Sequence, residues 1–348
     1  MIDYTNCNIK QVSVHNIGNK TNGEGLHLSR TMLDISDTRL RELLIKFFLK
    51  SFKDVEFYNF SFSNDDFKLN PIFNFASNIF YDSNSFHLNS VNIAKHLFET
   101  SIHPNIKSGD LFITKFSDIQ IDEELLEVIG IFKSENRQPF LKLNSETEDF
   151  VLKYDDGINI DKLDKGCLIF NISKTDGFKV CIVDKSNKSF EAQYWKDIFL
   201  QLQSCNDNFH NTKELLNITK SYISKQVSED FDISKTDKID LLNRSLVYFE
   251  NHDSYNREEF ETKVFQNKNM LESFQNYNNA YKTKNKIYID DDFEISSQAV
   301  RKQARAFKSV LKLDKNFHIY IHGNKDLIEQ GVESDGRKYY KIYYDKEQ

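Results

Sequence analysis

The sequence predicts an α+β protein: an N-terminal antiparallel sheet with flanking helices, followed by a helical region that ends in a small sheet. Two observations support this class. Between about Leu111 and Asp184, six short apolar segments are joined by turn residues with no helix between them, which is typical of antiparallel hairpins. On both sides of this region, apolar residues recur at the spacing of amphipathic helices.

The first part begins with alternating apolar residues at 9–14, which indicate a strand. A helix is expected to follow Ser36 or Asp37, either of which is a good N-cap, and another is expected from about Ser90 to Thr100. The six strand candidates are LFITKF, LEVIGIFK, FLKL, FVLKY, CLIFNI and KVCIVD. The tight loop at Asp176-Gly177 predicts that the last two form a hairpin.

The second part, after Trp195, has helical texture. Capping boxes at Asn211 with Glu214 and at Asn256 with Glu259 predict two helix starts, the first helix running to about Val227. Two stripes are expected in the core: Ile239, Leu242, Leu246 and Phe249, and Met270, Phe274, Tyr277 and Tyr281. Strands are expected at 286–290, 317–322 and 338–344. The polar loop 204–212 predicts a boundary, hence domains 1–205 and 206–348.

The charge of the chain is locally positive, although its total is negative. The 348 residues include 46 Lys and Arg against 53 Asp and Glu, which gives a net charge of -7. From Ser296 to the end there are 11 basic and 7 acidic residues, a net of +4, so the preceding residues carry -11. This distribution is expected if one face meets a polyanion while the remainder does not.

The stretch 296–312 predicts a basic amphipathic helix. Its apolar face would hold Val300, Ala304, Phe307 and Leu311. Its cationic stripe would hold Arg301, Arg305, Lys308 and Lys312, flanked by Lys302, with Lys315 and Lys325 as outer contributors. Such a stripe is either a solvated face or a phosphate-contacting face. No acid lies between Glu294 and Asp314, so the helix cannot form the internal ion pairs of an ordinary solvated face, and this favours phosphate contact.

Motifs for catalysis and for nucleotide binding are absent from the sequence, so we expect neither an enzyme nor a bound cofactor. The acidic run Asp290, Asp291, Asp292 and Glu294 could gather a divalent cation for a nuclease, but it is better explained as a solvated strand end. His318 and His322 lack further ligands for a metal, and their protonation could instead add charge beside the basic helix. The four cysteines, Cys7, Cys167, Cys181 and Cys205, are scattered and form no C-x-x-C motif, so we expect ordinary reduced thiols.

Targeting and membrane signals are also missing. The first residues, MIDYTNCNIKQ, have neither the basic nor the apolar region of a signal peptide, and the run LLIKFFL is too short to span a membrane. We therefore expect a cytoplasmic protein.

Several segments resemble one known family in the same order along the chain. They are NIAKHLFETSIHPNIKSGDLFI, GINIDKLDKGCLIFN, AQYWKDIFL, AVRKQARAFKSVLKLDKNFHIYIHG and GRKYYKIYY. The chain resembles the bacterial nucleoid-associated protein family of the NdpA type, in its Bacteroidetes-like form. This resemblance implies a cytoplasmic protein of the nucleoid that binds DNA without enzymatic chemistry. It supplies no binding motif that transfers residue by residue.

The function predicted from these observations is binding of double-stranded DNA with little sequence preference, through phosphate contacts of the basic helix. The alternative is a non-enzymatic scaffold, recruited to the nucleoid by a nucleoid or DNA-processing protein and supplied with contact surface by 30 Phe and 16 Tyr. A metal-dependent nuclease is the third hypothesis. The chain could also form a symmetric homodimer, which would double the cationic surface.

Overall fold

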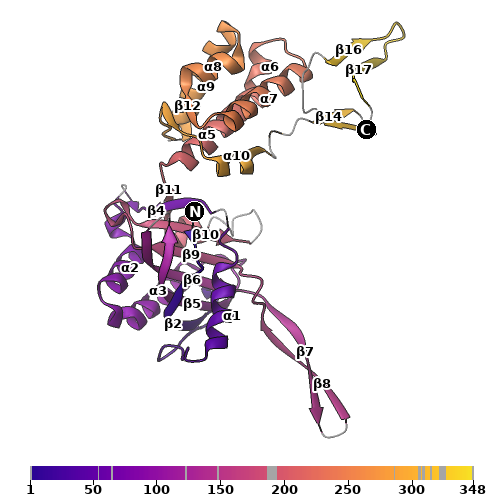
Figure 1. The fold of residues 1–348 in the computed structure, drawn as a ribbon. Coiled ribbons are helices and arrows are strands. Elements are labelled where there is room, and N and C mark those ends of the chain that lie inside the picture. Colours follow the sequence, from indigo (N-terminus) through magenta and orange to yellow (C-terminus); the bar gives the residue numbers. More distant parts are fainter. Residues whose placement is uncertain are drawn as a thin grey trace. The chain divides into compact units, whose positions relative to one another are not determined.

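A computed structural model describes residues 2–53, 55–63, 66–121, 124–146, 149–185, 194–285, 287–304, 307, 310–313, 316–320 and 327–346, with backbone only for 146 and 310–312. The chain divides into two compact units, unit 1 (Met1–Cys205) and unit 2 (Asn206–Gln348). A large antiparallel sheet occupies unit 1, and helices dominate unit 2 (Figure 1). This confirms the predicted α+β class. No helix of the described part is long and apolar enough to cross a membrane.

Unit 1 is built on a sheet of nine strands in the order β11-β4-β10-β9-β6-β5-β2-β3, with β1 pairing on β5. The strands are β1 (Ile2–Asp3), β2 (Asn8–Ile17), β3 (Leu26–Leu28), β4 (Phe57–Phe60), β5 (Gly109–Ile121), β6 (Glu124–Ser134), β9 (Lys165–Phe170), β10 (Lys179–Asp184) and β11 (Leu202–Ser204). Every neighbouring pair is antiparallel. Gly177, at φ 92°, turns the chain between β9 and β10 and confirms the hairpin predicted there.

Both faces of this sheet are buried, and successive side chains of its central strands point to opposite faces. In β5, Leu111 and Ile113 belong to one apolar core, whereas Phe112 belongs to the other. The first core is completed by α2 (Pro71–Tyr81), α3 (Phe86–Thr100) and a π-helix (Tyr194–Leu200). The second is completed by α1 (Thr38–Leu49), whose Phe48 ring stacks on Phe132 at 4.3 Å. The unit therefore has helices on both sides of one sheet.

The helices of unit 1 begin close to the predicted positions. Asp37 caps α1 by accepting hydrogen bonds from the backbone N–H groups of Arg39 and Leu40. The helix α3 begins at Phe86, earlier than the predicted start near Ser90. Short 3-10 turns lie at Lys20–Asn22, Phe67–Leu69, Ser83–Ser85 and Lys174–Asp176.

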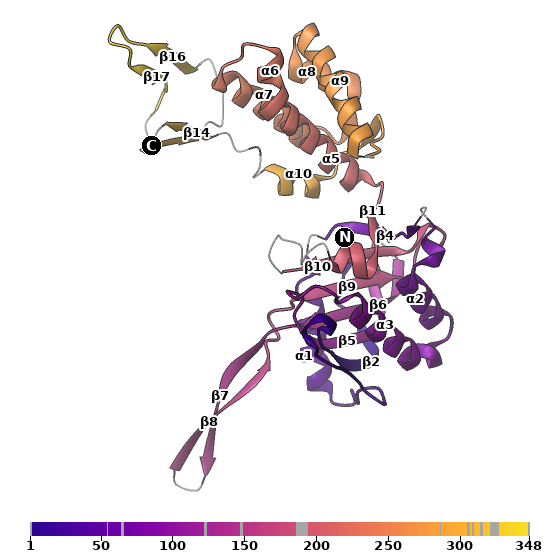
Figure 2. The ribbon, with the colours of Figure 1, turned by 180° about the vertical axis from the view of Figure 1, so that it is seen from behind.

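Two of the predicted strands leave the body of unit 1. They are β7 (Arg137–Glu146) and β8 (Asp149–Ile158), which pair antiparallel in a two-stranded sheet of their own. Figures 1 and 2 show this hairpin projecting away from the large sheet in both views. All six strands predicted between Leu111 and Asp184 are present.

Unit 2 consists of helices followed by short hairpins. The helices are α5 (Asn208–Ser221), which continues through a π-helical segment (Tyr222–Gln226) into α6 (Val227–Asp230), then α7 (Lys235–Asn251), α8 (Arg257–Phe265), α9 (Lys268–Asn285) and α10 (Ser297–Ala304). The hairpins pair β12 (Ser254–Asn256) with β13 (Asp292–Glu294), β14 (Val310–Leu313) with β15 (Phe317–Tyr320), and β16 (Ile328–Val332) with β17 (Lys338–Ile342). Both predicted apolar stripes lie in the cores of this unit, with Ile239 in a smaller cluster under the last hairpins.

Two local predictions in unit 2 are wrong. The helix α5 begins at Asn208 with Asp207 as its N-cap, and Asn211 is a buried residue inside the helix. Asp207 is the N-cap because its carboxylate accepts the backbone N–H of His210 at 2.8 Å, whereas the Asn211 amide donates to Asp290 at 2.9 Å. Residues 287–290 form no strand. The strand β13 begins at Asp292, and its Phe293 pairs with Tyr255 of β12. The second capping prediction is confirmed in part. Asn256 caps α8 by accepting the N–H of Glu259, but the Asn256 backbone N–H donates to the Tyr248 hydroxyl and not to Glu259.

Candidate nucleic-acid interface

The helix α10 is held in place by its apolar side and by hydrogen bonds of Ser296, the residue that precedes it. Ala299 and Val300 are buried, and α10 packs against α5 and α7. The Ser296 hydroxyl accepts the N–H of Ala299 at 3.3 Å, and the Ser296 backbone N–H donates to the Thr212 hydroxyl of α5 at 3.0 Å. These contacts determine which face of α10 points outward.

The outward face of α10 is cationic. Arg301 and Lys302 are exposed in the last turn of the helix, where positive charge also interacts favourably with the helix dipole. The Lys302 ammonium lies 5.0 Å from the centre of the Phe209 ring on α5, a cation–π distance. Phe209 thus positions one cation, while Arg301 forms no ion pair within the described part of the chain. Both groups can meet an anion.

The predicted single basic helix is not what the chain forms. The helix ends at Ala304, and Lys312 lies on β14, opposite His318 of β15. The helical spacing of apolar residues is lost here because 310–313 pairs with 317–320 and because Leu313 and Ile319 pack on Ile239 of α7. Phe307, a predicted apolar-face residue, is nevertheless buried in the core of unit 2. Of the other predicted cations, Arg305, Lys308, Lys315 and Lys325 lie outside the described residues.

The C-terminal hairpin β16–β17 adds further basic and aromatic side chains. The predicted strand at 338–344 is present as β17, which ends at Ile342. The Lys341 ammonium lies 5.1 Å from the Tyr343 ring centre and 3.7 Å from a Glu329 carboxylate oxygen. Contact with Tyr343 raises the pKa of Lys341. Ile328 and Tyr340 pack on Ile239, beside Leu313 and Ile319 of the preceding hairpin.

The acidic run before α10 is divided among several partners. Asp290 accepts from Asn211 at 2.9 Å, Asp292 accepts from Asn256 at 3.0 Å, and Asp291 lies 3.6 Å from the Arg257 guanidinium. Among the residues with described positions, no group of three or more His, Cys, Asp or Glu side chains is arranged to hold a metal ion. The run therefore stabilises the junction of α5, α8 and β13.

A groove in unit 2 has the wrong charge for DNA. It measures about 660 Å³ and is lined by Asn256, Glu258, Glu259, Glu261, Thr262, Lys263, Leu271 and Gln275. Three carboxylates against one ammonium repel phosphate, so this groove is not part of the candidate interface.

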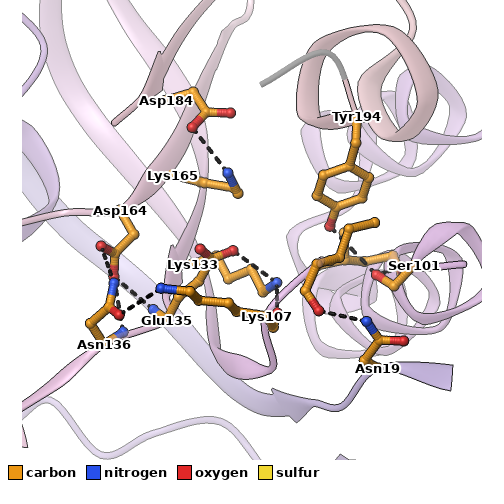
Figure 3. A network of polar contacts seen from close by, with 12 residues as sticks. Asn19, Ser101, Lys107, Lys133, Glu135, Asn136, Asp164, Lys165, Asp184 and Tyr194 are labelled. Carbon is orange, nitrogen blue, oxygen red and sulfur yellow. Dashed lines mark hydrogen bonds and ion pairs between the residues drawn. The ribbon is translucent and has the colours of Figure 1, made fainter. Parts of the chain in front are cut away.

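A buried polar network in unit 1 was not anticipated from the sequence (Figure 3). Lys133 and Lys165 are fully buried at the ends of β6 and β9, and they form ion pairs with Glu135 (3.1 Å) and Asp184 (3.0 Å). Burial lowers the pKa of Lys133, and Glu135 opposes this shift. Lysines interrupting apolar strands were the available signal, but a lysine in a strand usually extends its amine into water.

The same network anchors the root of the β7–β8 hairpin. The buried Asp164 carboxylate accepts the backbone N–H groups of Glu135 at 2.7 Å and Asn136 at 3.1 Å, and also the Asn136 side-chain amide at 2.8 Å. Arg137, the first residue of β7, donates to Asp110 at 2.8 Å. The direction in which the hairpin leaves the sheet is therefore determined by charge-assisted hydrogen bonds.

Comparison with known proteins identifies the family. A family model described as nucleoid-associated protein YejK (NA37) matches residues 13–347. No curated protein matches the chain. The match extends through both units, including the segments whose similarity to nucleoid-associated proteins was noted in the sequence. The chain therefore belongs to the NA37 family of nucleoid-associated proteins.

Proposed function

We propose that the chain binds duplex DNA, largely without sequence preference and without catalysing a reaction on it, through phosphate contacts of unit 2. The observation that carries this proposal is the geometry of α10. Its apolar side is buried against α5 and α7, so Arg301 and Lys302 must face away from the core. Membership of a nucleoid-associated family supports DNA as the polyanion.

The interface we propose is distributed over several elements rather than one helix. Arg301 and Lys302 of α10 form its centre, and Lys312 contributes from β14. Arg305, Lys308, Lys315 and Lys325 are the other basic residues that we include in this interface, and they lie outside the described residues. Contacts of this kind position a protein on the backbone without reading bases, so weak sequence discrimination is expected.

The test is a titration of fluorescent duplex DNA with the full chain at several salt concentrations. Arg301→Glu/Lys302→Glu should weaken binding by about 10-fold or more and should reduce the slope of log affinity against log salt by about 2. The matched control is Lys268→Glu/Lys284→Glu, which makes the same charge change at two exposed positions of α9. The control should keep most of the affinity and the slope. Circular dichroism checks that each variant is folded.

Two outcomes would count against this function. One is a wild-type affinity that barely changes between about 50 and about 200 mM salt. The other is an equal loss of affinity in the α10 variant and in the α9 control, because overall charge rather than a defined surface would then explain binding. Cleavage of the duplex with added magnesium, abolished by Asp291→Ala, would instead identify a nuclease.

Binding should also strengthen in mild acid if the histidines of the β15 region contribute. His318 is exposed on β15, directly across from Lys312, and His322 lies outside the described residues. A histidine ring gains a positive charge when it is protonated. The affinity measured at about pH 8 and about pH 6, at constant salt, decides this, and unchanged affinity excludes a contribution from these histidines.

Recruitment by a protein is the second candidate function. The apolar side chains exposed on β7–β8 favour contact with a protein surface. Capture of one dominant protein by the chain after thorough nuclease treatment would support recruitment.

A further inference from the structure

The β7–β8 hairpin has one apolar face and one polar face. Directly paired residues of an antiparallel ribbon share a face, and so do alternate residues along each strand. The pairs Leu141–Tyr154, Leu143–Leu152 and Ser145–Phe150 therefore lie on one face. The pairs Phe140–Asp155, Lys142–Lys153 and Asn144–Val151 lie on the other, where Lys142 forms an ion pair with Asp155 at 2.9 Å.

The apolar face is open to solvent in a single chain. The exposed fractions are 71% for Leu141, 64% for Leu143, 73% for Phe150, 61% for Leu152 and 78% for Tyr154. These values correspond to roughly 600 Å² of apolar side-chain surface, taking about 150–200 Å² for each fully exposed side chain. A contiguous apolar patch of this size on a folded protein marks an interaction site.

An isolated two-stranded ribbon of this kind is marginally stable in water and needs another layer on its apolar face. The root of the hairpin is nevertheless anchored, since Asp164 and Asp110 hold residues 135–137. The hairpin is thus presented in a defined direction with its apolar face uncovered.

The charge of the hairpin excludes a polyanionic partner. Between residues 137 and 158 there are three Lys or Arg against five Asp or Glu, and no cation lies among the three apolar-face pairs. DNA phosphates and anionic lipids would be repelled by this segment. The partner should therefore be an apolar protein surface.

We propose that the β7–β8 hairpin is a dimerisation arm that packs face to face on the same hairpin of a second copy of this chain. The face is self-complementary, because the central pair Leu143–Leu152 has one aromatic side chain toward each end, Phe150 toward the tip and Tyr154 toward the root. A two-fold axis through the central pair places Tyr154 of each copy over Phe150 of the other. The polar faces remain in water.

The area and the geometry both fit a second copy. Two facing hairpins would bury about 1,200 Å² of apolar surface, the lower bound of stable protein interfaces. Stacked sheets lie about 10 Å apart, whereas the eight strands that lie side by side in the large sheet span about 35 Å. The two bodies would collide if the arms pointed the same way, so the arms run in opposite directions. The result is a four-stranded sandwich with an apolar interior.

The test is sedimentation velocity of the full chain without DNA, across a wide range of concentrations. Wild type should sediment as a dimer, and Leu143→Asp/Leu152→Asp should weaken dimerisation on the order of 100-fold or more, because it places carboxylates at the centre of the apolar interface. The matched control, Asn144→Asp/Val151→Asp, adds the same charge to the adjacent pair on the other face. It should remain a dimer.

Hydrogen exchange provides a second measurement on unmodified protein. Backbone amides of β7 and β8 should be protected at concentrations where the chain is dimeric and should exchange faster on dilution. A monomeric wild type, a dimer that survives Leu143→Asp/Leu152→Asp, equal dissociation of the control, or protection independent of concentration would each overturn the proposal. All these readings are made without DNA, so they are independent of whether unit 2 binds duplex.

Discussion

We expect unit 1 to lose stability in mild acid because His15 must take up a proton when the unit unfolds. His15 is buried on β2. The Ser29 backbone N–H donates to its Nδ1 at 3.2 Å, and the Ser90 hydroxyl, which donates to the His87 carbonyl, lies 3.1 Å from its Nε2. The neutral ring with hydrogen on Nε2 satisfies all these contacts. A second proton on Nδ1 would face the N–H of Ser29.

The size of the effect follows from the pKa of His15. Burial, with a smaller contribution from His87, lowers this pKa from 6.5 to about 4. Between these values the unfolded state binds more protons than the folded state, so stability rises with pH. The contribution is complete above about pH 6.5 and is lost as pH falls to about 4. The expected loss is about 2 kcal/mol between about pH 7 and about pH 5, and about 3 kcal/mol by about pH 4.

The assay is urea denaturation at several pH values, followed by the fluorescence of the single tryptophan. Trp195 is buried in unit 1, so its signal reports the unfolding of that unit. Carboxylates also titrate in this range, and His15→Gln isolates the histidine contribution because it stays neutral. The exposed His27 on β3 provides the control His27→Gln.

The test compares how the unfolding free energies of wild type and the two variants depend on pH. The difference in unfolding free energy between wild type and His15→Gln should change by about 3 kcal/mol over the range, whereas His27→Gln should follow wild type. If the His15→Gln profile runs parallel to that of wild type, proton uptake by His15 is not the cause of acid sensitivity.

Three stability predictions follow from other parts of the structure. Lys133→Met should destabilise unit 1 by about 3 kcal/mol because it leaves the Glu135 carboxylate buried without its cation, and adding Glu135→Leu should recover at least half of that loss; full cost in the double variant would contradict this account. Gly177→Ala should cost at least about 1 kcal/mol in the same denaturation assay, since the residue has φ +92° and a Cβ would lie 2.7 Å from the Phe60 carbonyl oxygen, and unchanged stability would refute that strain. Asn256→Ala should remove the N-cap of α8 and lower the stability of unit 2 by about 1 kcal/mol, measured by circular dichroism, whereas a variant as stable as wild type would show that the cap is dispensable.

Several features of the fold could be predicted because they depend on neighbours in the sequence. The hairpin of β9 and β10 follows from the apolar runs at 167–170 and 180–183, which lie on either side of the Asp176-Gly177 turn. The start of α1 follows from Asp37, whose short carboxylate reaches the first backbone N–H groups of the helix. The choice of Asp207 over Asn211 as the cap of α5 could not be predicted, because both are good caps and the contact with Asp290 decides between them.

Part of the candidate interface could also be predicted, because it too depends on neighbours in the sequence. The docking of Val300 and the exposure of Arg301 follow from helical spacing in the sequence itself. The end of α10 at Ala304 does not, because Val310–Leu313 is short enough to fit either a helix or a strand. Pairing with β15 and packing of Leu313 on Ile239 select the strand.

The sequence by itself determined the α+β class, the strands β2 and β5 to β10 of unit 1 and the placement of cations near the C-terminus, because hydrophobic period, turn residues and charge are local properties. Only the tertiary structure decided which of those side chains are buried. Lys133 lies in the interior because Glu135 lies beside it, and Leu143 and Leu152 lie in solvent because their hairpin leaves the sheet. Burial depends on contacts between residues distant in the sequence, and composition alone assigns lysine to the surface and leucine to the core.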